Sequence, residues 1–474
     1  MFLAWREEVQ RSIIHTPEPR VVAGFRSQEQ ECSSSSMHIL YSVCFTLGFL
    51  LALPYFLIQA VTRKKYLSNL AQRLGFLSVP EDGPAQGGIW IHAVSVGEVL
   101  AALPLTQALG RRLPDLPLLV STTTITGQNL AHQKLVGIAR TLYFPLDWNF
   151  SVRRSLNQIR PRLVLIIETE IWPNFLRECR RRRIPVLLIN GRISDQSITR
   201  YRSIRWFMRR TLGYFNYCCM QSQADLDRIR TLGAAPETSE VCGNLKYDLR
   251  LPDDVEARTE VYRRLLGLND GAFLVVAGST MKGEELLVLS AFRKLREKSA
   301  RAILLLAPRH PERFGEVEQL LAQQSFCFRR RSALTLDGLS DSHGPVEVIL
   351  LDSMGELATL YALADVVFIG GSLVPTGGHN PLEPALYGKP VLFGPYMSNF
   401  REMAADFIRE GAAVQVQGQD TLAEKFVELH RHPDLGKEIG ERGFQIIARN
   451  RGATDRIMKR IEEVLPAMVA NRLE

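Results

Sequence analysis

The stretch Leu163 to Asn174, LVLIIETEIWPN, joins an apolar run to two carboxylates and then to a proline. A continuous run of branched apolar residues is typical of a strand buried on both faces, as the strands of parallel sheets are. Glu168 and Glu170 follow two positions apart, hence on the same side of the pleat. Such a pair could orient a substrate, hold another residue's charge or share a proton. Alternatively, both carboxylates could bind neighbouring backbone or the arginines from Arg180 to Arg183.

Short apolar runs alternate with longer amphipathic stretches along most of the chain, which predicts βα units and parallel sheets. The strand before Glu168 is predicted over Arg162 to Ile167. The other predicted strands are Gly88–His92, Leu118–Thr122, Pro185–Ile189, Phe273–Ala277, Ala302–Ala307, Val346–Leu351, Val366–Ile369 and Pro390–Phe393. The charged stretch Asp248 to Asn269 separates two groups of strands and is interpreted as a linker and a first helix. The pattern predicts an α/β protein with two doubly wound, Rossmann-like domains facing a cleft.

The composition fits this class. The chain has 474 residues, of which 46% are hydrophobic and 23% charged, as in an ordinary globular protein. A net charge of +8 favours anionic partners, but no nucleic-acid-binding motif accompanies it, so no nucleic acid is expected. The cysteines have no C-x-x-C spacing and are interpreted as reduced, mostly buried thiols. They are Cys32, Cys44, Cys179, Cys218, Cys219, Cys242 and Cys327.

An uncharged stretch from Ile39 to Val61 is long enough to cross a bilayer core of ~30 Å. Basic residues follow from Arg63 to Lys65, which predicts a single anchor with the rest of the chain on the cytoplasmic side. Because Pro54 and Gln59 interrupt the apolar run, a helix lying in the membrane interface is the alternative. Residues 1–36 are predicted to be a disordered tail, and Met37 is a candidate for the native start.

The predicted organisation therefore has five parts. They are a tail over residues 1–36, an anchor helix over 37–62, an N-terminal acceptor-binding domain over 63–247, a C-terminal nucleotide-sugar domain over 248–440, and C-terminal helices over 441–474 that pack back on the N-terminal domain.

A second strand end carries the motif IHAVSVGE, which ends at Glu98 in the first turn of a predicted helix. The positive end of the helix dipole favours the ionised carboxylate that a general base needs. The alternative is a glutamate that only complements its own helix.

Two further motifs offer cations at loops. The hexapeptide GNLKYD places Lys246 at the junction between the domains, where it could stabilise charge on a leaving group. A lysine exposed at the surface is the alternative. The motif APRHPERF follows a strand and makes Arg309 a phosphate candidate, with Arg313 a weaker one. His310 has no partner at metal-ligand spacing and is interpreted as structural.

The segment Gly370 to Pro395 contains GGHNPLEPA, a glycine-rich loop followed by a capping-box pattern. Asn380 is predicted to be the N-cap, with Pro381 first in the helix and Glu383 at the position that closes the box. Such a helix N-terminus would accept a phosphate. The motif DSMGE at Asp352 to Glu356 forms another strand-to-helix loop, suited to a base or ribose.

Together and in this order, HAVSVGE, ETEIWPN, GNLKYD, PRHPERF, DSMGE and GGHNPLEPA resemble the Kdo (3-deoxy-D-manno-octulosonic acid) transferase family, which has the GT-B glycosyltransferase fold. The resemblance covers Met37 to the C-terminus. It implies inverting transfer of Kdo from CMP-Kdo to a lipid A precursor, lipid IVA, in lipopolysaccharide synthesis. The partners would be CMP-Kdo, the lipid acceptor and inner-membrane lipids, at the cytoplasmic face of the inner membrane. No cofactor or metal is expected.

The resemblance also implies roles for individual residues. Glu98 matches the general base, and Glu168 and Lys246 match positions that stabilise the transition state. The positions that match contacts to CMP are Pro308, Arg309, Met354, Gly355, Glu356, Asn380, Pro381, Leu382 and Glu383. Alternative functions are a GT-B enzyme that uses another nucleotide sugar and a non-catalytic, membrane-tethered protein that binds nucleotide or anionic lipid.

Overall fold

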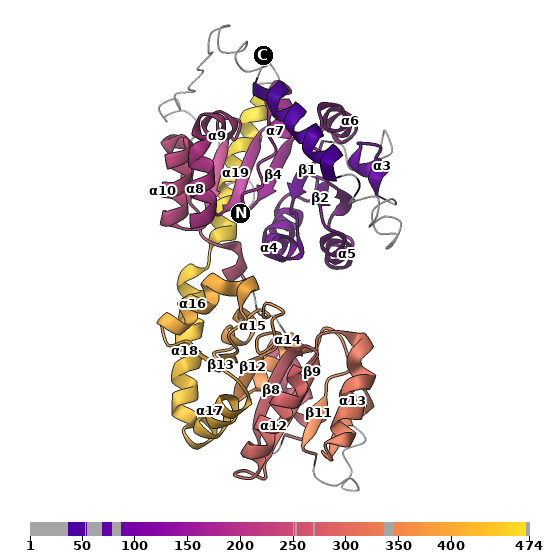
Figure 1. The fold of residues 1–474 in the computed structure, drawn as a ribbon, viewed down its shortest axis with the longest axis vertical. Helices are drawn as coiled ribbons and strands as arrows, with labels where there is room; N and C mark the ends of the chain where they lie inside the picture. The colour runs from indigo at the N-terminus through magenta and orange to yellow at the C-terminus, as the bar shows by residue number, and fades with distance from the viewer. Residues whose placement is uncertain are drawn as a thin grey trace, which may run out of the picture.

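The computed structural model describes residues 37–52, 54, 69–77, 87–249, 251, 254–268, 271–335 and 346–470. These residues form two α/β domains, each built on a seven-stranded parallel sheet with helices on both faces (Figure 1). The predicted fold class is confirmed for this part of the chain. The predicted tail over residues 1–36 lies outside the described residues.

The N-terminal sheet has the order β3-β2-β1-β4-β5-β6-β7. The order reverses between β1 and β4, and loops that leave these strands diverge there and make room for a ligand. Its strands are β1 Ile89–His92, β2 Leu118–Thr122, β3 Arg140–Tyr143, β4 Leu163–Ile167, β5 Val186–Gly191, β6 Tyr217–Met220 and β7 Ser239–Val241. Its helices are α3 Leu70–Arg73, α4 Val96–Arg112, α5 Ile125–Lys134, α6 Asn149–Ile159, α7 Pro173–Arg181, α8 Asp195–Ser203, α9 Arg205–Leu212 and α10 Gln223–Leu232, with 3-10 turns η2 Pro236–Thr238 and η3 Leu245–Tyr247.

The C-terminal sheet has the order β10-β11-β9-β8-β12-β13-β14, which reverses between β8 and β12. Its strands are β8 Phe273–Thr280, β9 Ala302–Pro308, β10 Phe328–Arg330, β11 Val348–Leu350, β12 Val366–Ile369, β13 Val391–Phe393 and β14 Ala413–Gln415. Its α-helices are α11 Val255–Leu265, α12 Glu284–Arg296, α13 Phe314–Gln323, α14 Leu357–Leu360, α15 Leu382–Ala385, α16 Arg401–Arg409, α17 Gln419–Arg431 and α18 Pro433–Asn450. The last helix, α19 Ala453–Ala470, belongs with the N-terminal domain. Its 3-10 turns are η4 Pro311–Arg313, η5 Arg331–Ala333, η7 Tyr361–Leu363 and η8 Ser398–Phe400.

The strands predicted from apolar runs are all present, β2 and β12 with the predicted bounds and the others with shifted ends, whereas β3, β6, β7, β10 and β14 were missed. These five lie toward the sheet edges, are three or four residues long, and carry polar residues, as in SEV and FRR. A short edge strand is half-solvated, so its sequence lacks the apolar run that marks a central strand. The strand β6 is buried between β5 and β7, and its YCCM sequence is too short to form such a run.

The chain crosses between the domains twice, and Asp248 ties the crossings together. Its carboxylate accepts hydrogen bonds from the backbone N–H groups of Gly452 and Thr454, at the start of α19. Helix α19 then packs on the N-terminal domain, where Ile457 and Ile461 join the core beneath β1 (Figure 1). The second crossing therefore returns the end of the chain to the first domain.

Residues 37–52 form a helix that lies against the N-terminal domain (Figure 1). Ser42 is hydrogen-bonded to Asn174 of α7, and Thr46 accepts a hydrogen bond from the indole of Trp148. No helix within the described ranges combines the length and apolar character needed to cross a bilayer. Residues 53 and 55–61 of the predicted span lie outside the described residues.

Candidate active site

A cavity of about 1390 Å³ opens between the domains at the carboxyl ends of both sheets. From the N-terminal domain Glu98, Glu168 and Lys246 line it, and from the C-terminal domain Arg309 and Asn380 do. The loops concerned follow β1, β4, β7, β9 and β12, and β1, β4 and β12 border the points where strand order reverses. Residues from distant motifs are thus brought to one space that two domains share.

Glu98 lies in the first turn of α4 and is 8% exposed. Its carboxylate accepts hydrogen bonds from the Val94 N–H at 2.7 Å and from the Ser95 hydroxyl at 3.0 Å. Burial raises the pKa of Glu98 to about 7, the Val94 N–H lowers it, and Glu168 and Glu170 raise it further. The expectation of a carboxylate kept ionised by its helix was therefore wrong, since desolvation outweighs the local donors. A pKa near neutrality suits a group that takes up a proton.

Glu168 and Lys246 form an ion pair across the N-terminal side of the cavity, with 3.3 Å between Oε1 and Nζ. Glu168 has φ +58°, a left-handed conformation that is costly for a residue with a side chain. Strain of this kind is common where a side chain must point into a site. Lys246 is not the isolated surface lysine of the alternative interpretation, because it faces a carboxylate in the cavity.

Asn190, at the end of β5, holds the loop that carries Lys246. It is fully buried, and its side-chain oxygen accepts the Leu245 N–H at 3.0 Å. Asn244 then accepts the Lys246 N–H at 3.0 Å, so the 3-10 turn is fixed from both sides. The hinge loop is thereby anchored to the central strands of the N-terminal sheet.

Glu170 lies near the same carboxylates without lining the cavity. Burial raises its pKa to about 7, and the neighbouring Glu168 raises it further. Because Lys246 is paired with Glu168, the negative charge that Glu98 and Glu170 would add is not balanced by that lysine. Burial first, and then the neighbouring carboxylates, make the two groups hold protons more tightly than exposed glutamates do.

The glycine-rich loop after β12 contributes the other wall. Gly377 and Gly378 have φ of +98° and +72°, and a Cβ on Gly378 would lie 2.3 Å from the Met397 sulfur. Asn380 accepts the Leu382 N–H at 3.1 Å and donates to Glu383 at 3.3 Å. Only glycine allows this backbone path, and it presents His379 and Asn380 to the cavity.

The predicted anion site at a helix N-terminus needs correction. Helix α15 spans only Leu382–Ala385, and Pro381 precedes it instead of opening it. A single turn has almost no macrodipole, because the dipole sums over aligned peptide units. The positive charge on this wall comes instead from Arg309, whose exposed side chain borders the cavity after β9.

The Arg309 guanidinium also acts on its neighbours. Burial lowers the pKa of His379 to about 4, and Arg309 and His310 lower it further, so the ring is neutral at pH 7. Burial raises the pKa of Glu383, whereas Asn380 and Arg309 lower it. Arg309 is therefore the group on this wall suited to bind a phosphate.

Comparison with known proteins identifies the family. A family model described as 3-deoxy-D-manno-octulosonic-acid transferase (kdotransferase) matches residues 68–249. The 3-deoxy-D-manno-octulosonic acid transferase of Haemophilus influenzae is 35% identical over 86% of this chain and 93% of its own length. The protein of the same name from Bordetella pertussis is 33% identical over 83% and 91%. This chain belongs to the Kdo transferase family.

Family membership makes the chain a glycosyltransferase. Among solved structures, UDP-GlcNAc 2-epimerase from Neisseria meningitidis has a TM-score of 0.52 and 14% identity, and covers 79% of this chain and 100% of its own. At that identity the likeness concerns the fold alone, two facing Rossmann-like domains.

Not every residue that was matched to the Kdo transferase motifs lines the cavity. Leu382 and Glu383 do, whereas Pro308, Pro381 and Met354 to Glu356 do not. Glu356 is held by Tyr262 at 3.0 Å and Arg331 at 2.7 Å, and Met354 is 62% exposed. A role for this loop in binding CMP remains a prediction.

Sequence reasoning missed several charged residues of this Kdo transferase family member. Arg111, Lys134 and Arg192 line the cavity from the N-terminal domain. Arg192 also pairs with Glu402 of the C-terminal domain at 2.5 Å. Arg111 and Lys134 sit at helix ends, where a basic residue usually complements the dipole, so the sequence offered no signal to separate them.

Proposed function

We propose that this chain transfers Kdo from CMP-Kdo to a lipid A precursor, lipid IVA, with inversion at the anomeric carbon. The observation that carries the proposal is the shared cavity, in which Glu98 and the Glu168–Lys246 pair face Arg309 and Asn380 from the other domain. One wall offers a carboxylate that can take a proton, and the other offers a cation for a phosphate. These are the two groups that an inverting sugar transfer needs on opposite sides of the reacting carbon.

In the proposed reaction Glu98 accepts the proton of the acceptor hydroxyl as that oxygen attacks the sugar. An alcohol is a weak nucleophile, and a base with a pKa near the working pH removes its proton most effectively. The Val94 N–H and the Ser95 hydroxyl fix the carboxylate's orientation. Glu98 is thus positioned before substrate arrives, which lowers the entropic cost of the step.

Departure of CMP leaves negative charge on the phosphate while positive charge grows on the sugar ring. Arg309 is the phosphate partner in this proposal, and Lys246 adds positive charge from the opposite wall. Glu168 orients Lys246 and faces the developing positive charge. Preorganised charges of this kind stabilise the transition state without rearranging during the step.

We also propose that the N-terminal helix docks this protein on the cytoplasmic face of the inner membrane. Along residues 37–52 the contact face packs on the domain, whereas the opposite face is apolar and exposed. The exposed large apolar residues of this face are Ile39, Leu40, Val43, Leu47, Leu50 and Leu51. Two exposed aromatic side chains lie at its flanks, Phe150 and Trp206, and the neighbouring helices α7 and α9 are rich in arginine. An apolar face with basic flanks suits the interface of an anionic bilayer.

The membrane proposal is tested by co-sedimentation of the full chain with vesicles of anionic and of neutral phospholipid. Replacing Leu47 and Leu51 by aspartate should reduce binding to anionic vesicles at least tenfold, since apolar contact is lost and the new carboxylates are repelled by the anionic surface. Leu286→Asp is the matched control, because Leu286 is 46% exposed on the other domain. Equal binding by the double variant and the control would contradict the proposal.

The reaction is tested by incubating purified full chain with a CMP-Kdo generating system and lipid A precursor. The acceptor's mass should increase by one or more Kdo units. A parallel incubation with UDP-GlcNAc as donor serves as the control and should give no product. Transfer from the UDP-sugar without transfer from CMP-Kdo would favour the alternative of another nucleotide-sugar donor.

A further inference from the structure

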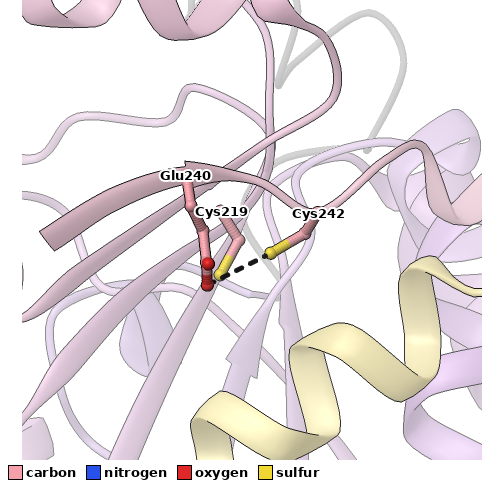
Figure 2. Close-up of side chains that lie close together, drawn as sticks. All are labelled: Cys219, Glu240 and Cys242. Atoms are coloured by element: carbon pink, nitrogen blue, oxygen red, sulfur yellow. Dashed lines mark hydrogen bonds between the residues drawn. The ribbon is translucent and has the colours of Figure 1, made fainter.

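Three side chains gather away from the cavity, at the end of β6 and β7. The sulfurs of Cys219 and Cys242 and a carboxylate oxygen of Glu240 all lie within 4.8 Å of one another (Figure 2). The Cys242 thiol donates to the Glu240 carboxylate at 3.7 Å. Both thiols are at most 1% exposed and face the apolar cluster that includes α19. None of these residues lines the active-site cavity or takes part in the proposed reaction.

The strand register decides what the two thiols can do. Cys219 is paired in register with Glu240, and Cys242 follows Glu240 by two positions on the same face of the sheet. Strand spacing and rise per residue then put the Cα atoms of the two cysteines roughly 8 Å apart. A disulfide needs less than about 7 Å, so oxidation would require the backbone to move. A tetrahedral zinc ion, with Zn–S distances of about 2.3 Å, holds its sulfurs nearly 4 Å apart, and the present arrangement allows this.

The charge of the cluster would match a divalent ion once both thiols are deprotonated. Arg460 of α19 is bonded to Glu240 through both its Nε and a terminal nitrogen. Two thiolates, a carboxylate and this guanidinium would sum to a charge that a divalent ion cancels. A metal-bound carboxylate usually has such an outer partner, which orients it. The Glu240 side chain is 32% exposed, so this ligand of the cluster is in contact with solvent.

We propose that Cys219, Cys242 and Glu240 form a binding site for a soft divalent cation such as Zn²⁺, with water as the fourth ligand. Each thiol releases its proton to solvent as the metal–sulfur bond forms. Bound metal would join β6 to the segment that leads into the Lys246 loop, because Cys242 directly precedes Gly243 and Asn244. The Cys242 carbonyl also accepts a hydrogen bond from Arg456 of α19 at 2.7 Å. The site would therefore stiffen the base of the hinge, a role independent of the proposed transfer reaction.

The test uses Cd²⁺ as a spectroscopic probe and Zn²⁺ in a thermal shift, both on the full chain. In the parent protein Cys32, Cys44 and Cys327 are replaced by serine, because Cys44 and Cys327 are exposed and Cys32 lies outside the described residues. These cysteines then cannot contribute to cadmium binding. Cadmium should titrate to one equivalent per chain, with a thiolate-to-cadmium absorption band. Zinc should raise the Tm, because a ligand that binds only the native state stabilises it.

Cys219→Ala and Cys242→Ala should each weaken cadmium binding at least tenfold and abolish the zinc shift in Tm. Alanine is chosen because a buried cysteine behaves as a small apolar residue. Cys218→Ala is the matched control, since Cys218 is the next residue on β6 and packs in the core on the opposite face of the sheet. Circular dichroism of the metal-free variants establishes that they fold. Absence of saturable binding, or equal loss of binding in Cys218→Ala, would overturn the proposal.

Discussion

Glu98 and Glu284 occupy equivalent places in the two domains, and their environments differ. Each lies in the first turn of the helix that follows the first strand of its sheet, α4 after β1 and α12 after β8. Glu98 accepts one backbone N–H and one hydroxyl, and it lines the cavity. Glu284 is fully buried and accepts backbone N–H groups at 2.5 to 2.9 Å. The donors are Met281, Gly371, Ser372 and Leu373.

The comparison shows how the same fold position serves structure in one domain and chemistry in the other. Burial raises the pKa of Glu284, but the four N–H donors oppose the rise and use its oxygens fully. The carboxylate therefore fixes the glycine-rich loop where Gly370 passes close to Ser279. Glu98 has fewer hydrogen-bond donors than Glu284, and two other carboxylates lie near it. Its charge is therefore incompletely satisfied and available to a substrate.

The largest expected effect is on catalysis by Glu98→Gln. Glutamine keeps the shape and can still accept the Val94 N–H, but it cannot take up a proton. Turnover should fall by roughly 10²- to 10⁴-fold, the usual contribution of a general base, while the affinity for CMP stays within twofold. Product mass and a CMP binding titration measure the two quantities. Retained turnover would remove Glu98 from the proposed mechanism.

Glu284→Gln should act on structure and donor binding together. Its amide can accept at only one oxygen, so buried N–H groups of the loop lose their partner at about 1–3 kcal/mol each. We expect a lower Tm and at least tenfold weaker CMP binding. Glu297→Gln, at the exposed C-terminal end of the same helix, is the control. A Glu284→Gln protein with normal Tm and normal CMP affinity would contradict a structural role for Glu284 in the glycine-rich loop.

The smallest predicted effect is a pH-dependent gain in stability for Glu98→Gln. The pKa of Glu98 is about 7 in the folded chain and 4.5 when exposed, so the native state binds the extra proton between these values. Its unfolding free energy therefore falls as pH rises from 4.5 to 7. Between pH 4.5 and a pH above 7 the wild type should therefore lose roughly 3 kcal/mol of stability that the variant keeps, at 1.36 kcal/mol per pKa unit. Tm measured for both proteins from pH 4.5 to pH 8 should diverge, and a constant difference would contradict a raised pKa.

Much of the architecture followed from local sequence. The central strands were predicted from their apolar runs, and the two groups of strands gave the two parallel sheets. Strand ends also located Glu98, Glu168 and Arg309, because ligands of parallel sheets gather at the carboxyl ends. The short edge strands escaped prediction because half-solvated segments carry no comparable pattern, and the buried β6 escaped because its four residues are too few to form one.

The sequence by itself determined which residues form the central strands and which motifs place charged residues in loops. It could do so because periodicity and side-chain chemistry are local properties. Tertiary structure decided the rest. It buried Glu98 beside other carboxylates and so raised its pKa, and it limited α15 to a single turn. It also brought Cys219 next to Cys242 across two strands. Burial, pairing and proximity depend on parts of the chain far apart in sequence, and no local pattern encodes them.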